Sequence, residues 1–341
     1  MFPDKIRRFM EQTHADKYAT KTGGWRRIIE NSVPKNSYIK GTMRRIESGA
    51  YLSIAAPVPK DESNSSYLTD LSSDSLQAIF DRGIAAYTSL TASQTDYLSL
   101  HSLGVLEEFR EFLRSRNLID YGTTAARAWL YSRITNSMVS RRSHSPCDAL
   151  EIGAGSGYMA TCLIWTGCIR SFTFVDLPEM LPFSAYWIAH HFGIDNIGFG
   201  VGCQQKFRFL TPDELMELPR QSIDLSININ SFAEMDNFTV KYYFEQIYRT
   251  SRPSSLHFNV NRDGKAEQSN GEVLFSNPLI YPYQPDDHVL FWEVDQFSLI
   301  KNSGFFGSRQ NKNNAYARGS IIHPTDEDRR LVIAGRQAQY I

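Results

Sequence analysis

An acidic residue and three evenly spaced glycines form the segment of this chain with the clearest chemical character. They are Glu151, Gly153, Gly155 and Gly157, within DALEIGAGSGYMATCL. Glycine reaches positive φ at little cost and lets a ligand approach bare backbone, and the free N–H groups of a following helix bind polar ligands. A glycine turn between a strand and a helix is therefore typical of a nucleotide-binding site.

A second carboxylate ends the next expected strand. Asp176 follows Gly153 by 23 positions, where a carboxylate can accept hydrogen bonds from both ribose hydroxyls of a nucleoside. Asp176 could instead cap a helix, because Pro178 follows it and aspartate is common at helix starts. The combination with the glycine turn favours the ribose role.

The glycine spacing separates two classes of nucleotide ligand. A dinucleotide-binding turn has the pattern GxGxxG, whose third glycine allows close packing of the helix on the strand. In this chain that position is Tyr158, and the pattern is ExGxGxG. An NAD-dependent oxidoreductase is therefore the least favoured enzyme class.

The pattern ExGxGxG resembles motif I of the class I S-adenosylmethionine-dependent methyltransferases. Later segments resemble further motifs of that class in the same order: FTFVD with DLPEM, then VGCQQ after the third strand, then IDLSININSFAEMD at the fourth. The resemblance implies an α/β, Rossmann-like fold with a mostly parallel, seven-stranded sheet, helices on both faces, and S-adenosyl-L-methionine as cofactor.

The resemblance also implies which residues contact the cofactor. Asp176 would bind the ribose, Cys203 and Gln204 would lie near the adenine, and Asn230 and Ser231 would hold the methionyl part, although ordinary turn chemistry explains the last pair equally well. The expected cofactor site consists of Glu151, Gly153, Ala154, Gly155, Gly157, Asp176, Leu177, Cys203, Gln204, Asn230 and Ser231.

A narrower resemblance concerns the acceptor. DLPEML, NSFAEMD and NVNR together look like the sugar O-methyltransferases, over roughly residues 120–320 and most strongly over 148–237. This resemblance implies methylation of a hydroxyl on a sugar or glycosylated small molecule. DLPEM is also similar to a segment of O-methyltransferases that act on phenolic or polyketide products. A catalytically silent, cofactor-binding subunit is the alternative outside enzymes.

Glu234, in NSFAEMD, is the candidate general base. An alcohol is a weak nucleophile until its proton is leaving, and a carboxylate that takes this proton contributes ~10²–10⁴-fold. We expect in-line attack of the hydroxyl oxygen on the methyl carbon. Glu234 could instead cap the helix that begins near Phe238, but Asp236 lies closer to that start and is the expected cap.

Two residues that end the fifth expected strand are candidates for acceptor binding. Ligands meet open α/β sheets at the carboxyl ends of the strands, so Asn261 and Arg262 could bind sugar hydroxyls. The alternative for Arg262 is a solvated turn residue beside DGK. The aromatic loop YPYQPDD could stack on a sugar ring or form plain surface.

The sequence does not predict that a metal ion takes part in methyl transfer. Asp236 and Asn237 could supply oxygen ligands to Mg²⁺. No second acidic pair follows at a suitable spacing, so we expect a metal-free mechanism.

The elements that position these residues begin near residue 145, where the pattern changes. Helices are expected before it, including segments 72–90, 97–117 and 124–140, and residues 4–12 form a short amphipathic helix. After it, short apolar runs alternate with helical stretches, which indicates a parallel sheet. Expected strands are DALEIG, SFTFVD, IGFGV, SIDLSINI, SLHFNV and RRLVIAG. We predict two regions: 1–120, a substrate cap or dimerisation region, and 121–341, the cofactor-binding domain.

Composition limits the partners. The 341 residues carry a formal net charge of −1 and lack an apolar run of membrane-spanning length, which argues against nucleic-acid and membrane partners. The four cysteines show neither CxxC nor metal-ligand spacing and are expected to be reduced. Together with an amino-terminal segment that lacks the apolar core of a signal peptide, this predicts a cytoplasmic protein with a small-molecule acceptor.

Overall fold

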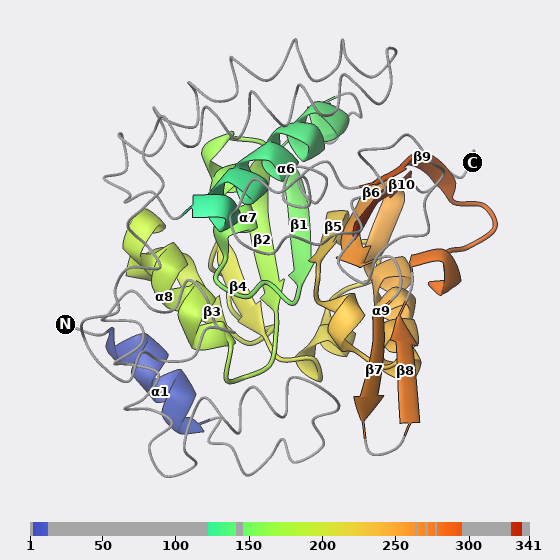
Figure 1. Ribbon diagram of the computed structural model, residues 1–341. Helices are drawn as coiled ribbons and strands as arrows, with labels where there is room; N and C mark the ends of the chain where they lie inside the picture. The colour runs from blue at the N-terminus through green and yellow to red at the C-terminus, as the bar shows by residue number, and fades with distance from the viewer. Residues whose placement is uncertain are drawn as a thin grey trace.

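The computed structural model describes residues 3–12, 122–140, 146–262, 265–269, 272–276, 278–294 and 329–335. Figure 1 shows a central twisted sheet with helices against it and a separate two-stranded hairpin beside it. The helices expected at 72–90 and 97–117, and the boundary expected between residues 120 and 121, lie outside the described residues.

The sheet has eight strands in the order β3-β4-β2-β1-β5-β6-β10-β9. The six strands from β3 to β6 run parallel, and β10 runs antiparallel to both of its neighbours. Their bounds are β1 Cys147–Ile152, β2 Ile169–Val175, β3 Ile197–Phe199, β4 Phe207–Leu210, β5 Ile223–Ile229, β6 Ser251–Arg262, β9 His288–Val294 and β10 Arg329–Gly335. This arrangement confirms the predicted fold class, with one strand more than expected.

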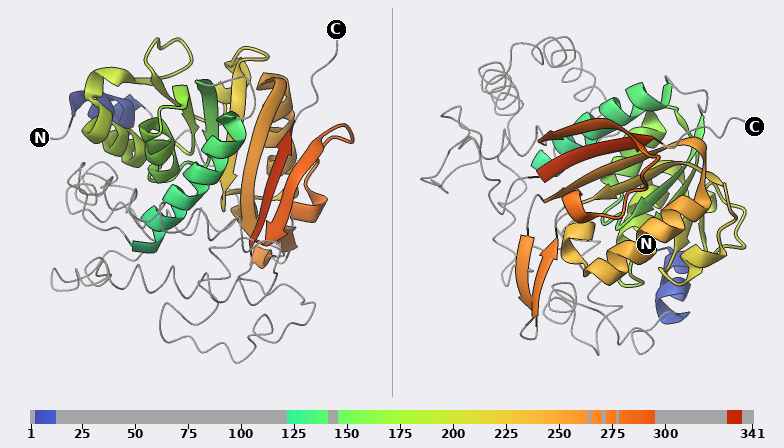
Figure 2. Two further views of the ribbon diagram at one scale, coloured as in Figure 1. Left: turned by 90° about the horizontal axis from the view of Figure 1, so that it is seen from above. Right: turned by 90° about the vertical axis from the view of Figure 1, so that its right-hand side faces the viewer.

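Helices cover both faces of the sheet, as the right-hand view of Figure 2 shows for α6 and α9. One buried cluster joins the sheet to α6 (Gly122–Ser140), α7 (Tyr158–Trp165) and α8 (Leu181–Phe192), and a second joins the other face to α9 (Asn237–Thr250). Within the first cluster, Trp129 of α6 contacts Trp165 of α7 at 5.2 Å between ring centroids. None of the described helices is long and apolar enough to span a membrane.

The helix α1 (Asp4–Gln12) lies against the edge of the sheet. Phe9 stacks on Phe199 of the edge strand β3 at 4.1 Å between ring centroids, and Lys5 Nζ donates to the carbonyl of Ile197. The helix expected at residues 4–12 is therefore confirmed. It covers a strand whose outer side would otherwise be open.

A charged cluster ties together the amino ends of four strands. Arg252 Nη1 donates to Asp224 Oδ2 at 2.6 Å and to Asp148 Oδ2 at 3.0 Å, and Arg170 Nε donates to Asp148 Oδ1 at 3.0 Å. The Asp224 side chain is 4% exposed. Burial opposes ionisation, but the hydrogen bonds from Arg170, Ser171 and Arg252 lower the pKa of Asp148 to about 2. This cluster stabilises the sheet edge opposite the glycine turn.

One strand of the sheet is missing from the expected set. The strand β4, at Phe207–Leu210, lies between β2 and β3, the strand at IGFGV. The segment TPDELMEL after β4 contains a 3₁₀ turn, η6 (Glu214–Glu217). The short run FRFL has Lys206 before it and Arg208 within it, and these charges interrupt the apolar pattern of a strand. Burial of Phe207 and Phe209 in the sheet explains why the segment is nevertheless a strand.

The two-stranded hairpin lies after β6. Strands β7 (Lys265–Ser269) and β8 (Glu272–Ser276) pair antiparallel, and Figure 1 shows the hairpin beside α9. The remaining 3₁₀ turns are η5 (Ile194–Asn196), η7 (Phe232–Glu234) and η8 (Pro278–Ile280). The strand β8 contacts both η7 and α9. The hairpin thereby lies next to the turn that carries Glu234.

Candidate functional site

The glycine turn joins β1 to α7 at the carboxyl edge of the sheet. Its three glycines have φ of 70°, 56° and 80°, a region that side-chain-bearing residues rarely adopt. A Cβ on Gly153 would lie 2.0 Å from Ser231 Oγ, whereas a Cβ on Gly155 would meet no atom of the residues that the structure describes within 4 Å. Gly153 is therefore required by a neighbouring loop, and Gly155 leaves open space for a ligand. Gly157 is the N-cap of α7 and donates to Ala154 O at 2.9 Å.

Asp176 follows β2 and contacts the glycine turn directly. Its Oδ2 accepts from the Gly155 N–H at 2.9 Å and its Oδ1 from the Leu177 N–H at 2.8 Å. Burial raises the pKa of Asp176 to about 6 against the opposing effect of these two bonds. The helix-cap alternative is wrong, because α8 begins at Leu181 with Met180 as its N-cap. Each carboxylate oxygen retains capacity for a further donor, such as a ribose hydroxyl.

Glu151 is a buried carboxyl group with incomplete hydrogen bonding. Its side chain is 3% exposed, and its Oε2 has no hydrogen-bond partner among the described residues. Burial, together with the charge of Asp176, raises the pKa of Glu151 to about 8. An unpartnered buried polar atom costs free energy. A positively charged donor placed beside it would lower the pKa and remove that cost.

The turn after β5 approaches the glycine turn from the neighbouring strand. Asn230 adopts a φ of 63°, uncommon for a residue other than glycine, and its N–H donates to Val260 O at 2.7 Å. The Ser231 side chain lies against Gly153, because a Cβ added to Gly153 would clash with the Ser231 side chain. Glu234 ends η7 and is partly buried. The structure thus places Asn230, Ser231 and Glu234 in one turn at the edge of the sheet where β1 and β2 end.

Asp236 caps α9, as expected. Its Oδ1 accepts from the Thr239 N–H at 2.7 Å, and the helix begins at Asn237. This geometry commits the Asp236 side chain to the helix start. The described residues contain no group of three or more His, Cys, Asp or Glu side chains that could hold a metal ion.

The two candidate acceptor residues lie at the end of β6, as expected. Asn261 is fully buried, and its side chain bonds to Asn228, Asn259 and the Ala233 N–H. These contacts favour a supporting role for Asn261 over direct contact with an acceptor. Arg262 is the last residue of β6 and pairs in register with Arg329 of β10, which places its backbone in the sheet rather than in a turn.

Cys203 and Gln204 lie in the loop between β3 and β4. A Cβ on Gly198 of the edge strand would lie 2.7 Å from Cys203 Sγ. The adenine role of Cys203 and Gln204 stays a prediction. The segment that follows β4, the true neighbour of β2, begins at Thr211, whose N–H donates to Glu214 Oε2 at 2.7 Å.

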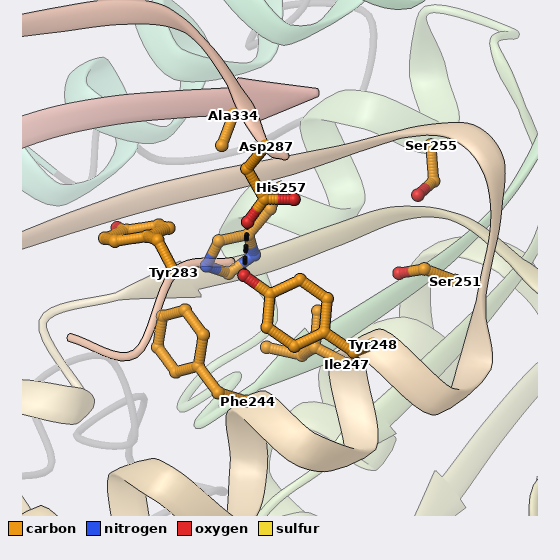
Figure 3. A pocket seen from close by; sticks show the side chains of 9 residues that line it. All are labelled: Phe244, Ile247, Tyr248, Ser251, Ser255, His257, Tyr283, Asp287 and Ala334. Carbon is orange, nitrogen blue, oxygen red and sulfur yellow. Dashed lines mark hydrogen bonds between the residues drawn. The ribbon is translucent and has the colours of Figure 1, made fainter. Parts of the chain in front are cut away.

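The aromatic loop 281–287 is an anchor rather than an exposed stacking surface. Tyr281 is 5% exposed and contacts Phe232 at 5.7 Å between ring centroids. At the other end of the loop, Asp287 accepts from the Tyr248 hydroxyl. Figure 3 shows this bond at the wall of a small cavity of about 20 Å³, enough for roughly one water molecule.

His257 lines the same cavity. Its Nδ1 bonds to Ser226 Oγ at 2.9 Å, its Nε2 has no partner within the described part of the chain, and burial lowers its pKa to about 4. His257 is therefore a neutral core histidine. The cavity is bordered by the last turns of α9 and the start of β6, away from the glycine turn.

Sequence reasoning missed the buried amides Asn228 and Asn259. They lie opposite each other in the β5–β6 register, and both are fully buried. A usable signal was present: polar residues recur at every second position of two otherwise apolar strands, in SIN and HFNVN. That period places the polar residues of each strand on one face.

Comparison with known proteins gives a likeness of overall shape only. No protein-family model and no curated protein matches the chain. A structure of geranyl diphosphate methyltransferase in complex with SAM has a TM-score of 0.41 and 13% identity over 60% of this chain and 85% of that one. An S-adenosylmethionine-dependent methyltransferase from Mesorhizobium loti has a TM-score of 0.39 and 14% identity, covering 63% of this chain and 100% of that one.

A third similar structure is the [4+2]-cyclase SpnF, with a TM-score of 0.38 and 14% identity over 61% of this chain and 81% of that one. At scores and identities this low, likeness supports no conclusion about activity, and one fold commonly hosts different reactions.

Proposed function

We propose that this chain is an S-adenosylmethionine-dependent O-methyltransferase that acts on a hydroxyl of a sugar or glycosylated small molecule. The observation that supports the cofactor most strongly is the buried, unpartnered Oε2 of Glu151 beside a turn of three positive-φ glycines. A ligand with an ammonium group and a ribose suits the two carboxylates of this site. A pyrophosphate would instead bring negative charge towards Glu151 and Asp176, which argues against a dinucleotide.

Different residues at the carboxyl edge would bind different parts of the proposed cofactor. Glu151 would accept from the ammonium group and Asp176 from the ribose hydroxyls, while the open space at Gly155 would admit the ligand to the backbone. Asn230 and Ser231 would contact the methionyl part from the facing turn. The cofactor itself would supply an electrophilic methyl group on a positively charged sulfur.

Glu234 is proposed as the general base. It lies in η7, three residues after Ser231, whose side chain lies against Gly153. In this role its carboxylate accepts the proton that the acceptor hydroxyl loses as the oxygen is methylated. Alignment of the two reactants supplies much of the remaining rate enhancement, since positioning alone is worth ~7–11 kcal/mol.

An exposed aromatic ring near this turn supports a ring-shaped acceptor. Phe238, in the first turn of α9, is 84% exposed and lies four residues after Glu234. A flat apolar ring can pack against the apolar face of a sugar or against a phenol. The sugar itself is proposed from the resemblance of DLPEML, NSFAEMD and NVNR.

Calorimetry tests the cofactor. We expect saturable binding of S-adenosylmethionine and no binding of NAD, and binding of NAD alone would refute the proposal. Transfer of a labelled methyl group to sugar nucleotides, free glycosides and phenols then identifies the acceptor class. Transfer only to phenols would refute the sugar substrate, and cofactor binding with transfer to no compound would indicate a silent subunit.

Replacement of Glu234 tests the base once an acceptor is known. We expect Glu234→Gln to lower kcat by about 10²-fold or more while cofactor affinity stays within a few-fold, because only proton transfer is lost. The matched control is Glu245→Gln, an exposed carboxylate on α9, which should leave kcat unchanged. Equal turnover by the wild type and Glu234→Gln would remove Glu234 from this role.

A further inference from the structure

Three buried asparagines form a hydrogen-bonded network between the glycine turn and the turn that carries Glu234. Asn228 Nδ2 donates to Ile152 O at 2.9 Å, directly before Gly153, and to Ser231 Oγ at 3.3 Å. Asn228 Oδ1 accepts from the Phe232 N–H at 3.2 Å and from Asn261 Nδ2 at 2.8 Å. The Asn228 amide therefore uses both of its donors and two acceptor positions.

Asn261 extends the network to the next residue of the turn. Its Oδ1 accepts from the Ala233 N–H at 3.0 Å, and its Nδ2 also donates to Asn259 Oδ1. Asn259 Nδ2 in turn donates to the Tyr283 hydroxyl at 2.8 Å. Successive backbone N–H groups of η7, at residues 232 and 233, are thus held by two side chains from the sheet below.

Burial makes this arrangement rigid. Asn228, Asn259 and Asn261 each have an exposed fraction of 0%, so no water can replace a broken bond and each bond is expensive to lose. The turn also contains Asn230 at a φ of 63°, a left-handed conformation that asparagine tolerates better than most residues with a side chain.

We infer that Asn228 and Asn261 are positioning residues that fix the 230–234 turn in register with the glycine turn, so that a ligand held at the glycine turn also orders the turn carrying Glu234. This inference rests on the proposed function for the identity of the ligand. The hydrogen bonds from Asn228 and Asn261 to the turn, which we call the brace, exist in the free protein and can be tested without any ligand.

Hydrogen exchange of the full-length protein, followed by mass spectrometry, tests the brace. We expect Asn261→Ala to speed exchange of amides 231–236 about tenfold, because the Ala233 N–H loses its acceptor. The comparison variant is Asn259→Ala, which removes an equally buried amide from the same strand; this amide bonds to Asn261 and Tyr283 but to no residue of the turn. Equal acceleration of amides 231–236 in both variants would overturn the inference, because general loosening of β6 would then explain it.

Ligand binding tests the coupling between the glycine turn and the 230–234 turn. Adding S-adenosylhomocysteine to the wild type should slow exchange at 231–236, and Asn261→Ala should bind this probe about tenfold more weakly than Asn259→Ala does. Binding that leaves exchange at 231–236 unchanged would overturn the coupling. Failure of the wild type to bind the probe would refute the proposed cofactor instead, while the comparison of free variants would still decide the brace.

A second variant covers the case in which Asn261→Ala does not fold. In Asn261→Asp the carboxyl oxygen can still accept from Ala233, but the ionised form cannot donate to Asn228. We expect amides 231–236 to exchange faster than in the wild type at pH 8, with the difference shrinking at pH 5 as the buried carboxyl gains a proton. A difference that does not depend on pH would contradict the brace.

Discussion

At the scale of single residues, the carboxyl edge of the sheet combines two carboxyl groups whose surroundings oppose their ionisation. Glu151 is buried without a full set of partners, and Asp176 stabilises the glycine turn through the Gly155 N–H. Burial raises both pKa values, and the charge of Asp176 adds to the effect on Glu151. Carboxyl groups with strongly shifted pKa values are more frequent at functional sites than elsewhere, which makes Glu151 and Asp176 candidates for ligand contact.

Ligand binding should therefore release a proton. With its pKa raised to about 8, Glu151 is mostly protonated at pH 7, and a cationic ligand beside it lowers that pKa. We expect S-adenosylmethionine binding at pH 7 to release close to one proton, measured as more exothermic calorimetric binding in Tris than in phosphate. At pH 9 the release should largely disappear, because the free protein has already lost the proton.

Glu151→Gln is the control for this proton release. The amide cannot titrate, so the enthalpies in the two buffers should agree after replacement, and binding should weaken because the negative charge is lost. A buffer dependence that persists in Glu151→Gln would assign the released proton to another group.

At the scale of elements, two glycines of the same turn serve different purposes. Gly153 is pressed against Ser231, whereas Gly155 borders open space. The first holds two loops together, and the second leaves room for a ligand. Substitution should therefore separate stability from binding.

Gly153→Ala should lower the free energy of unfolding by about 2 kcal/mol or more, from positive φ and the clash with Ser231. Gly155→Ala should cost only about 1 kcal/mol, from φ alone, yet weaken S-adenosylmethionine binding strongly. Urea denaturation and calorimetry measure the two effects. In the double variant Gly153→Ala/Ser231→Gly, part of the lost stability should return; additive losses would contradict the clash.

The ion cluster at the opposite edge should contribute stability only. Replacing Arg252 by Met removes a positive charge beside the buried Asp224 carboxylate. We expect this change to lower the free energy of unfolding by about 3 kcal/mol at pH 7. The salt-bridged Asp148 has its pKa lowered to about 2. Its contribution to the free energy of unfolding is therefore present above pH 4 and is lost as pH falls through 2. The deficit of Arg252→Met should therefore shrink at low pH.

The exposed Arg220 provides the comparison for this cluster. Arg220→Met should change the free energy of unfolding by less than about 0.5 kcal/mol. Denaturant titrations at pH 7 and at pH 3 measure both variants. A deficit of Arg252→Met that stays constant with pH would contradict the assigned electrostatic origin.

At the scale of the whole molecule, the ion cluster and the candidate site lie at opposite edges of one sheet. Two hydrophobic clusters, one on each face, fix the strands. The ion cluster holds the amino ends, and the carboxyl ends carry the loops in which side chains converge. Helix α1, more than a hundred residues earlier in the chain than β1, covers the edge strand β3.

Removing the stacking contact of α1 should therefore destabilise the whole sheet edge. Phe9 is 7% exposed, and we expect Phe9→Ala to lower the free energy of unfolding by about 3 kcal/mol. Phe238→Ala is the matched control, because Phe238 is 84% exposed and its loss should cost less than about 0.5 kcal/mol. Equal effects in urea denaturation would show that α1 does not contribute to sheet stability.

Much of the fold could be predicted because its signals are local. The apolar runs of β1, β2, β5 and β6, and the helical spacing of α7, α8 and α9, each identify an element from a few neighbouring residues. Strand order could not be predicted in the same way: β4 is four residues long and carries Arg208, and only its pairing with Phe172–Val175 identifies it. The loop that carries Cys203 and Gln204 leads into β4, a strand that is missing from the expected set.

The sequence by itself determined the alternation of strands and helices, the glycine turn and the carboxylate that follows the next strand, because these depend on backbone freedom and short-range periodicity. The tertiary structure alone decided which groups meet. It set Ser231 against Gly153, left Oε2 of Glu151 without a partner, and joined Asn228 to Asn261 across two strands. Contacts of this kind depend on strand order and register, which arise from packing of the whole sheet rather than from any local segment.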